Sequence, residues 1–399
     1  MDNEIVLTRY ADALDAYRRK ELGQAQYDEG HVLMAGVLVN LHGTEHRDRR
    51  RVENQLFRRE TFLHYEKEVF PDVTAAVLAP HARRGATELV ALGHELMLHL
   101  AVLVAGVDRP EGTEAETRRL AGQLKVFIEA LTLAQSTLDK DERRAAIADA
   151  FTDWRREFLT PSARRRRALL AGLADGTVPE RQLPRDVLTL LLRHQDRLGL
   201  SDELIARETA FFLLVAAHTS ATAFVRAVHH LLEWTARHPE DARRAADDPR
   251  FAQRCVHETI RLNPSSTVGM RRALAPVTLE SGITVPEGAR VVIDLRTVNR
   301  DPAAYGPDAA EFDPHREIAP GVMPFGLSFA AGMHVCIGQD LAAGVLQSGS
   351  GPDASLYGLV ATAVRELFAL GVRRDPAAPP VRDTTTTREY WARYPVLLG

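Results

Sequence analysis

PFGLSFAAGMHVCIG, residues 324–338 and here termed the cysteine loop, carries the strongest signal in the chain. It sets Cys336 between Gly332 and Gly338, and a helical pattern follows the cysteine directly. A neutral thiol among apolar neighbours is usually a packed core residue. A thiolate at the start of a helix, in contrast, is stabilised by backbone N–H groups and can bind a metal. The glycines favour this second interpretation, because they let the backbone approach a flat ligand closely.

The pattern Phe329-x-x-Gly332-x-His334-x-Cys336-x-Gly338 resembles the haem-binding signature of the cytochrome P450 monooxygenases. In that family the matching cysteine is the proximal haem ligand, and thiolate donation favours O–O cleavage. The resemblance implies that Cys336 is the metal ligand of haem b (iron protoporphyrin IX). Phe329 would shield the sulfur, and His334 would reach a haem carboxylate. The implied contacts of the cofactor in this loop are Phe329, Gly332, His334, Cys336 and Gly338.

Glu258 and Arg261 lie three residues apart on one helix face, which by itself is an ordinary surface ion pair. In the family this pair is buried behind the cysteine loop. Arg271 aligns with an arginine that binds a haem propionate, and Arg272 is the close alternative. Glu311 stands where an arginine is usual, so we expect Glu258 to lack one partner.

A basic segment begins at Gly43 and resembles the family's His-x-x-x-Arg helix. His46 and Arg50 would then contact the haem propionates, because a buried dianionic edge needs charge-assisted donors. Taken alone, the segment is typical of an exposed basic helix. Its other arginines, with Arg58 and Arg59, could form a positive face for an acidic ferredoxin or flavodoxin as redox partner.

The longest predicted helix covers residues 201–238, with Ser201 as N-cap and Pro239 as the stop. Its middle is apolar all round and should be buried. The resemblance places this central helix over the distal side of the haem, where the family shows Ala-Gly-x-(Asp/Glu)-Thr-Thr. Here the acid and the glycine are replaced, and one hydroxyl is kept. The candidate distal residues are Ala217 at the cofactor, and His218, Thr219 and Ser220 in catalysis.

Length alone would suggest two or three domains, but the motifs above share one site, so we predict one large globular domain, residues 1–399. Hydrophobic residues make up 45% of the chain and charged residues 26%, and no linker rich in Gly, Ser or Pro divides it. Residues 277–279, 283–285 and 290–293 are predicted as short strands in hairpins, and most of the first 260 residues as helix. The fold class is therefore mainly α with a small β subdomain. The resemblance makes it a cytochrome P450 fold, with the haem between the central helix and the cysteine-loop helix.

The net charge and the terminal sequence predict the class of partner and the cellular compartment. A formal net charge of −4 argues against nucleic-acid binding. Only two cysteines, no signal-peptide pattern and no long uninterrupted apolar run favour a cytoplasmic protein without a membrane span. Compared with the family, the amino terminus is short, and a Gly/Ser/Pro break at residues 348–352 interrupts the helix after the cysteine.

The resemblance implies a bacterial-type monooxygenase that oxidises a small organic molecule with O2. A secondary-metabolite intermediate is one possible substrate. Two alternatives stay open: the same fold performing desaturation, coupling, rearrangement or peroxide-driven oxidation, because the distal acid is missing, and a non-catalytic haem protein that senses or stores a ligand. The expected substrate-pocket walls are residues 24–41, 213–217, 264–270 and 384–391.

Overall fold

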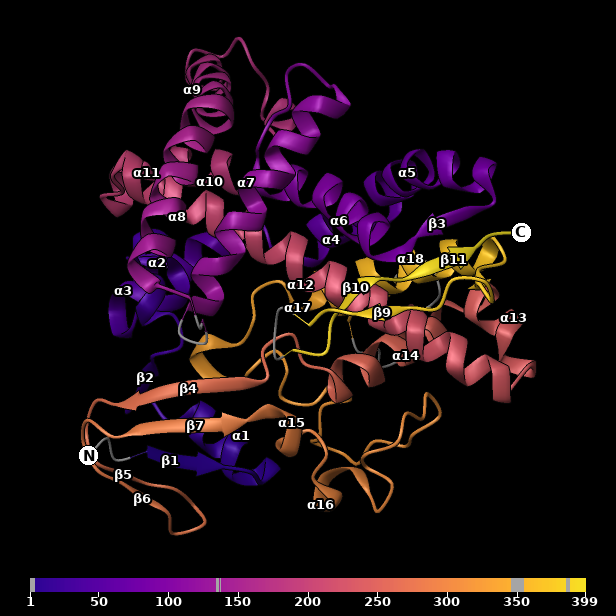
Figure 1. The fold of residues 1–399 in the computed structure, drawn as a ribbon. Helices are drawn as coiled ribbons and strands as arrows, with labels where there is room; N and C mark the ends of the chain where they lie inside the picture. Colours follow the sequence, from indigo (N-terminus) through magenta and orange to yellow (C-terminus); the bar gives the residue numbers. More distant parts are fainter. Residues whose placement is uncertain (1–3, 134–135, 137, 346–354, 385–387) are drawn as a thin grey trace. The chain divides into compact units, whose positions relative to one another are not determined.

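The computed structural model describes residues 4–133, 136, 138–345, 355–384 and 388–399 (Figure 1). The chain forms two compact units. The first comprises Met1–Gly23, Phe62–Met97 and Thr219–Gly399, and the second comprises Gln24–Thr61 and Leu98–His218. That the whole chain acts as one domain stays a prediction. The predicted break at residues 348–352 lies outside the described residues.

Helices dominate both units, as the sequence predicts for the first 260 residues. They are α1 (Tyr10–Arg18), α2 (His31–Met34), α3 (Gly43–Glu53), α4 (Arg59–His64), α5 (Phe70–Arg84), α6 (Leu89–Ala105), α7 (Glu114–Thr132), α8 (Lys140–Trp154), α9 (Thr160–Ala174), α10 (Val187–Arg193), α11 (Gln195–Leu198), α12 (Asp202–Arg237), α13 (Glu240–Asp247), α14 (Pro249–Leu262), α15 (Leu295–Val298), α16 (Pro302–Tyr305), α17 (Gln339–Ala343) and α18 (Leu359–Ala369).

The strands are short and belong almost entirely to the first unit. They are β1 (Glu4–Leu7), β2 (Leu22–Gln24), β3 (Ala86–Glu88), β4 (Val268–Ala273), β5 (Val277–Thr278), β6 (Thr284–Val285), β7 (Arg290–Asp294), β8 (Arg373–Arg374), β9 (Val381–Arg382), β10 (Trp391–Arg393) and β11 (Pro395–Leu397). The three predicted strands correspond to β5, β6 and β7. β5 and β6 form the expected hairpin, whereas β7 pairs elsewhere.

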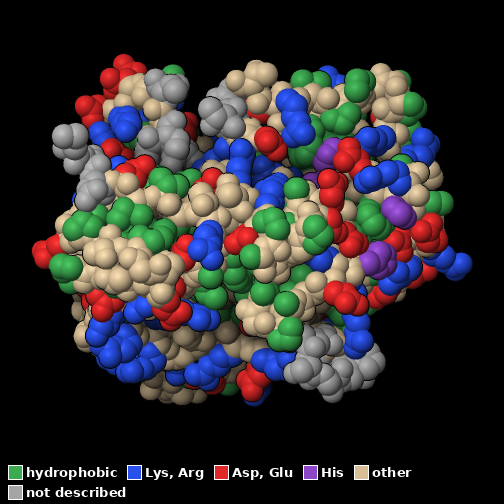
Figure 2. All heavy atoms as spheres, turned by 90° about the horizontal axis from the view of Figure 1, so that it is seen from below, with side chains coloured by type: hydrophobic (Ala, Val, Ile, Leu, Met, Phe, Trp, Pro, Cys, Tyr) green, Lys and Arg blue, Asp and Glu red, His purple; other side chains and the backbone are tan. Residues whose placement is uncertain are grey.

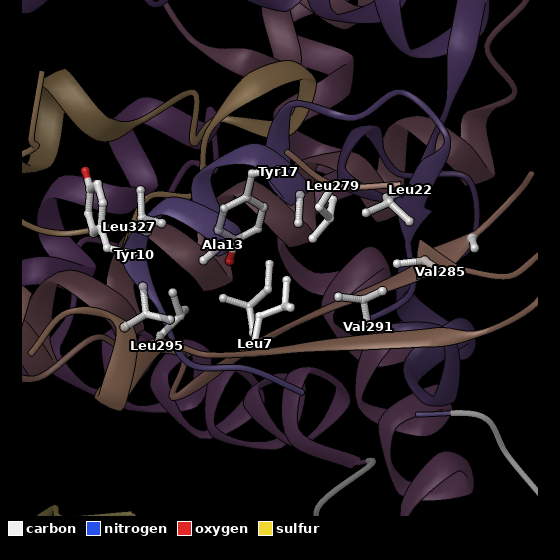
Figure 3. Close-up of a cluster of buried hydrophobic side chains, with 14 of the residues drawn as sticks. Leu7, Tyr10, Ala13, Tyr17, Leu22, Leu279, Val285, Val291, Leu295 and Leu327 are labelled. Carbon is white, nitrogen blue, oxygen red and sulfur yellow. The ribbon is translucent and has the colours of Figure 1, made fainter. Parts of the chain in front are cut away.

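The largest sheet has the strand order β1-β7-β4-β2. β7 runs parallel to β1 and antiparallel to β4, with Arg271 opposite Val291. Side chains of α1 pack on this sheet: Figure 3 shows Ala13 and Tyr17 facing Leu7 and Val291 in one apolar cluster. Burial of this face therefore holds α1 against β1 and β7, and it fixes the register of the strands.

The central helix of the prediction is α12. Ser201 Oγ accepts a hydrogen bond from the amide of Leu204 at 3.1 Å, so Ser201 does cap the helix, and α12 ends at Arg237, two residues before Pro239. Among the described helices of at least 18 residues, α12 has the length and hydropathy to cross a bilayer. However, 72% of its apolar window is buried in the fold, and a soluble core helix meets the same criterion.

Charged side chains of both signs are mixed on the face of the molecule in Figure 2. This is expected of a chain with 50 Lys and Arg residues and 54 Asp and Glu residues.

Candidate functional site

The cysteine loop is fastened to the end of α14 by a buried asparagine, Asn299. Its side-chain oxygen accepts from the amide of Leu327 at 2.8 Å, and its nitrogen donates to Ser328 Oγ at 2.9 Å and to the carbonyl of Arg261 at 3.0 Å. Ser328 Oγ in turn donates to the carbonyl of Ile260 at 2.9 Å. Because all these polar atoms are paired, the network fixes the start of the loop on α14.

The two cysteines differ in accessibility. The amide of Cys336 donates to the carbonyl of Phe329 at 2.8 Å, which closes the loop, and the Cys336 side chain is exposed. Cys255 is fully buried in α14, and burial raises the pKa of its thiol well above the usual value. A buried thiol of this kind stays neutral and inert. Cys336 therefore provides the sulfur that is available to a ligand, and α17 begins three residues after it.

The two glycines that flank Cys336 meet different structural requirements. Gly332 has φ +69°, and a Cβ there would lie 2.4 Å from the carbonyl oxygen of Tyr17. Its small size is thus required by contact with α1, and not only by a flat ligand. Gly338 has φ −90°, which any residue adopts, and a Cβ there would meet no protein atom within 4 Å. The open space at Gly338 fits the close approach of a flat group.

Phe329 and His334 are both half-buried in the cysteine loop. The Phe329 ring lies edge-on to Phe325, with 4.9 Å between the centroids. His334 ends the 3-10 turn Gly332–His334. Shielding of the sulfur by Phe329 and contact of His334 with a carboxylate stay predictions.

Glu258 and Arg261 are buried, as the resemblance implies. Arg261 Nε donates to Glu258 Oε2 at 2.7 Å, and Arg261 Nη2 to Oε1 at 2.6 Å. The expectation that Glu258 lacks a partner is wrong: Arg316 Nε donates to its Oε1 at 3.0 Å. Glu311, which stands in the expected arginine position, contributes only its backbone carbonyl to Arg261 and Arg316. One carboxylate is thus held between two guanidinium groups behind the cysteine loop.

Arg271 and Arg272 point to opposite sides of β4, because neighbouring side chains alternate along a strand. Arg271 is 3% exposed, and its guanidinium lies over the Tyr17 ring at 4.8 Å, whereas Arg272 is exposed. Tyr17 also supplies the carbonyl against which Gly332 packs, so Arg271 lies on the side of the sheet that meets the cysteine loop. This favours Arg271 over Arg272 as the cofactor contact.

His46 and Arg50 lie on α3 in the second unit, four residues apart and hence on one helix face. Burial, together with the nearby Arg50 and His42, lowers the pKa of His46 to about 4. At neutral pH His46 is therefore an uncharged hydrogen-bonding group. Arg49, expected on the exposed basic face, is instead buried and pairs with Glu208 at 3.0 Å.

The distal segment of α12 is continuous helix. Ala217 and Ser220 are buried, at 7% and 5% exposure, while His218 and Thr219 are half-buried. The division between the two units falls within this segment, with Ala217 and His218 in the second and Thr219 and Ser220 in the first. A hydroxyl at Ser220 is thus held inside the protein on a rigid element.

A family model described as cytochrome P450 matches residues 142–347, which is a little over half of the chain. The chain belongs to the cytochrome P450 family. The match includes α12, the Glu258–Arg261 pair and the cysteine loop.

Named relatives of this P450 are similar over parts of their length. A vitamin D(3) 25-hydroxylase from Pseudonocardia autotrophica is 33% identical over 42% of this chain and 38% of that protein. A cyclooctat-9-en-7-ol 5-monooxygenase from Streptomyces melanosporofaciens is 26% identical over 79% of this chain and 71% of that protein. The chain spans well under half the length of several curated relatives that it matches.

The P450 haem domain of Tepidiphilus thermophilus has the same fold. Its structure superposes with a TM-score of 0.74 at 19% sequence identity, and covers 98% of this chain and 88% of that one. The predicted fold class is thereby confirmed.

P450 proteins carry a haem-thiolate cofactor, and the residues of this chain fit one. The sulfur of Cys336 is exposed at a loop with a fixed backbone, and the space at Gly338 is open. A buried cation, Arg271, lies on the sheet beside this loop.

The structure adds Asn299, Ser328 and Arg316 to the residues that build this P450 site. In the sequence, Ser328 appears only as one residue of the cysteine loop. The pairing of Arg316 with Glu258 spans 58 residues of sequence. Such long-range pairs leave no local pattern.

Proposed function

We propose that this P450 is a haem-thiolate monooxygenase that oxidises a small organic molecule with O2. The observation that carries the proposal is the exposed sulfur of Cys336, in a loop whose backbone is fixed by Asn299 and by its own amide contact with Phe329. Haem b, when bound, supplies the activation of oxygen.

The residues of the chain take separate roles in this proposal. Cys336 binds the iron, and its thiolate is favoured by the helix that follows. Arg271, Arg50 and His46 bind the propionates. With a neutral imidazole, His46 acts as an N–H donor, whereas the two arginines supply positive charge. On α12, Ala217 leaves room at the distal side, and the hydroxyl of Ser220 holds a proton close to the reacting atoms.

The proposed redox partner is an acidic ferredoxin or flavodoxin. Arg47, Arg51, Arg58 and Arg59 are exposed along α3 and the start of α4, so they provide a positive face for docking. Arg49 takes no part, because it is buried. We place the protein in the cytoplasm, where such carriers are found.

The substrate proposed here is a small organic molecule of secondary metabolism. The names of two relatives describe oxidation of vitamin D(3) and of cyclooctat-9-en-7-ol, which are compounds of this size. Mass spectrometry of products formed under isotopically labelled O2 tests oxygen insertion. Thr219 stands in place of the distal acid, and this favours desaturation or coupling as the second candidate, for which products contain no label.

The test of the haem assignment is the spectrum of reduced protein with carbon monoxide. We expect wild type to show the strongly red-shifted thiolate band and Cys336→Ser to lose it. Cys255→Ser is the matched control and should keep the band, because Cys255 is buried in α14. A thiolate band in Cys336→Ser, or none in wild-type protein loaded with haem, contradicts the proposal.

A further inference from the structure

A cavity of about 380 Å³ lies in the first unit, beside the carboxyl end of α14. Pro264 and Thr267 line it on one side and Glu389 on another. Three arginines also line it: Arg226 from α12, Arg296 from α15 and Arg300 just after α15. Pro264, Thr267 and Glu389 fall within the substrate-pocket walls that the sequence predicts, residues 264–270 and 384–391, of which 385–387 lie outside the described residues.

Arg226 is 4% exposed, so its positive charge is almost fully buried. Its two Nη atoms donate to the carbonyls of Asn263 and Glu389, each at 3.1 Å. Its Nε is buried and has no hydrogen-bond partner among the described residues. Burial lowers the pKa of Arg226 to about 10, so it is still a cation at neutral pH. Arg226 therefore contributes a buried positive charge beside the cavity.

Arg296 and Arg300 add positive charge to the same cavity. Both are half-buried, and Arg300 Nη1 donates to the carbonyl of Arg296 at 3.0 Å. In the part of the chain that the structure describes, neither they nor Arg226 form an ion pair with Asp or Glu. Glu389 is the acidic residue in the cavity wall, and its side chain is exposed. The three arginines therefore share this cavity with one carboxylate, which is exposed to solvent.

A purely structural role explains only part of this arrangement. The Nη bonds of Arg226 tie the end of α14 to the segment before β10, which accounts for its burial. They do not account for two further guanidinium groups that line the same cavity. Like charges brought together at low dielectric destabilise one another, and an anion between them offsets that cost.

We propose that this pocket binds the carboxylate of a small organic acid, with Arg296 and Arg300 as the donors and Arg226 as a buried positive charge beside them. Guanidinium groups match the planar geometry of carboxylates. The volume is at the lower end of the range for small-molecule sites, and it exceeds the needs of a bare inorganic anion. The carboxylate belongs either to the oxidised substrate or to a separate organic acid.

The test uses full-length, haem-loaded protein and two probes of the same shape, benzoate and benzamide, at constant ionic strength. Binding is followed by thermal unfolding and by ligand-observed NMR. We expect benzoate to bind and benzamide not to bind. Arg296→Gln and Arg300→Gln should each weaken benzoate roughly tenfold, since each removes one charged donor. Arg250→Gln, which removes an exposed charge at the other end of α14, is the matched control.

Arg226→Gln also removes two partly buried hydrogen bonds and so can fail to fold, which is why the two half-buried arginines decide the test. Equal binding of benzoate and benzamide would overturn the proposal. The proposal would also be overturned if Arg250→Gln reduced the affinity for benzoate as much as Arg296→Gln does. The Soret band identifies the source of the anion: a shift with benzoate indicates a substrate carboxylate, and binding without a shift indicates a separate acid. Either result supports the anion site, and neither depends on monooxygenase activity.

Discussion

Arg316 Nε donates to Glu258 Oε1 at 3.0 Å, the same oxygen that accepts from Arg261 Nη2 at 2.6 Å. The pair is buried, with side-chain exposures of 5% and 4%. Arg316 also binds the carboxylate of Asp308 and the carbonyl of Tyr305. This arginine therefore joins α14 to the irregular segment that leads into the cysteine loop.

Removing Arg316 should destabilise the protein strongly. Arg316→Met removes one of the two guanidinium groups that pair with the Glu258 carboxylate. Loss of one partner of a buried ion pair commonly costs about 3–5 kcal/mol. The free energy of unfolding in urea measures the effect. Arg243→Met is the control, since Arg243 pairs with Asp247 at an exposed site, and surface pairs contribute about 0–1 kcal/mol. Equal losses in the two variants would show that Arg316 is not a structural anchor.

Local patterns in the sequence predicted much of this site, and long-range contacts account for the rest. The cysteine loop, the Glu258–Arg261 spacing and the cap at Ser201 involve residues close in sequence, so their periodicity and residue types suffice. The pairing of Arg316 with Glu258 depends on how distant segments pack. Burial likewise cannot be read from a run of arginines, which is why Arg49 was expected on the surface.

The two glycines of the cysteine loop should respond differently to alanine. Gly332→Ala places a Cβ 2.4 Å from the carbonyl oxygen of Tyr17 at φ +69°, so we expect a destabilised protein even without haem. Gly338→Ala meets no protein atom within 4 Å, so the apoprotein should unfold at the wild-type temperature. Its haem content should fall, because the new methyl group occupies the proposed approach of the cofactor.

Thermal unfolding of apoprotein and the haem-to-protein absorbance ratio separate the two effects. A Gly338→Ala variant that binds haem as tightly as wild type would remove the argument that this position contacts the cofactor.

The stability of the second unit should fall as pH rises. Burial raises the pKa of Glu208 to about 7, against the opposing charge of Arg49, and raises the pKa of Glu53 well above its usual 4.5. The folded state then keeps protons that the unfolded chain releases above about pH 4.5. Because the folded state binds more protons in this range, its stability is greatest below about pH 4.5 and is lost as pH rises through about 7.

Glu53→Gln should flatten this profile, because glutamine stays neutral at every pH. The free energy of unfolding lost between pH 4 and pH 8 should be smaller in the variant than in wild type. Urea unfolding at each pH measures it. Glu45→Gln, at an exposed position of the same helix, should leave the profile unchanged. A wild-type slope that survives in Glu53→Gln would assign the pH dependence to other groups.

Catalysis should depend on Ser220. This residue is 5% exposed on α12, and Thr219 beside it carries no acid. If Ser220 holds the proton that the reaction consumes, Ser220→Ala should lower the product formed per reductant consumed by roughly tenfold or more, since positioned proton donors contribute about 10²–10⁴-fold. Ser220→Thr keeps the hydroxyl and should stay close to wild type. Haem content and the carbon monoxide spectrum should be unchanged in both variants, which separates proton supply from cofactor binding. Unchanged coupling in Ser220→Ala would mean that the proton arrives by another route, with His218 as the next residue to replace.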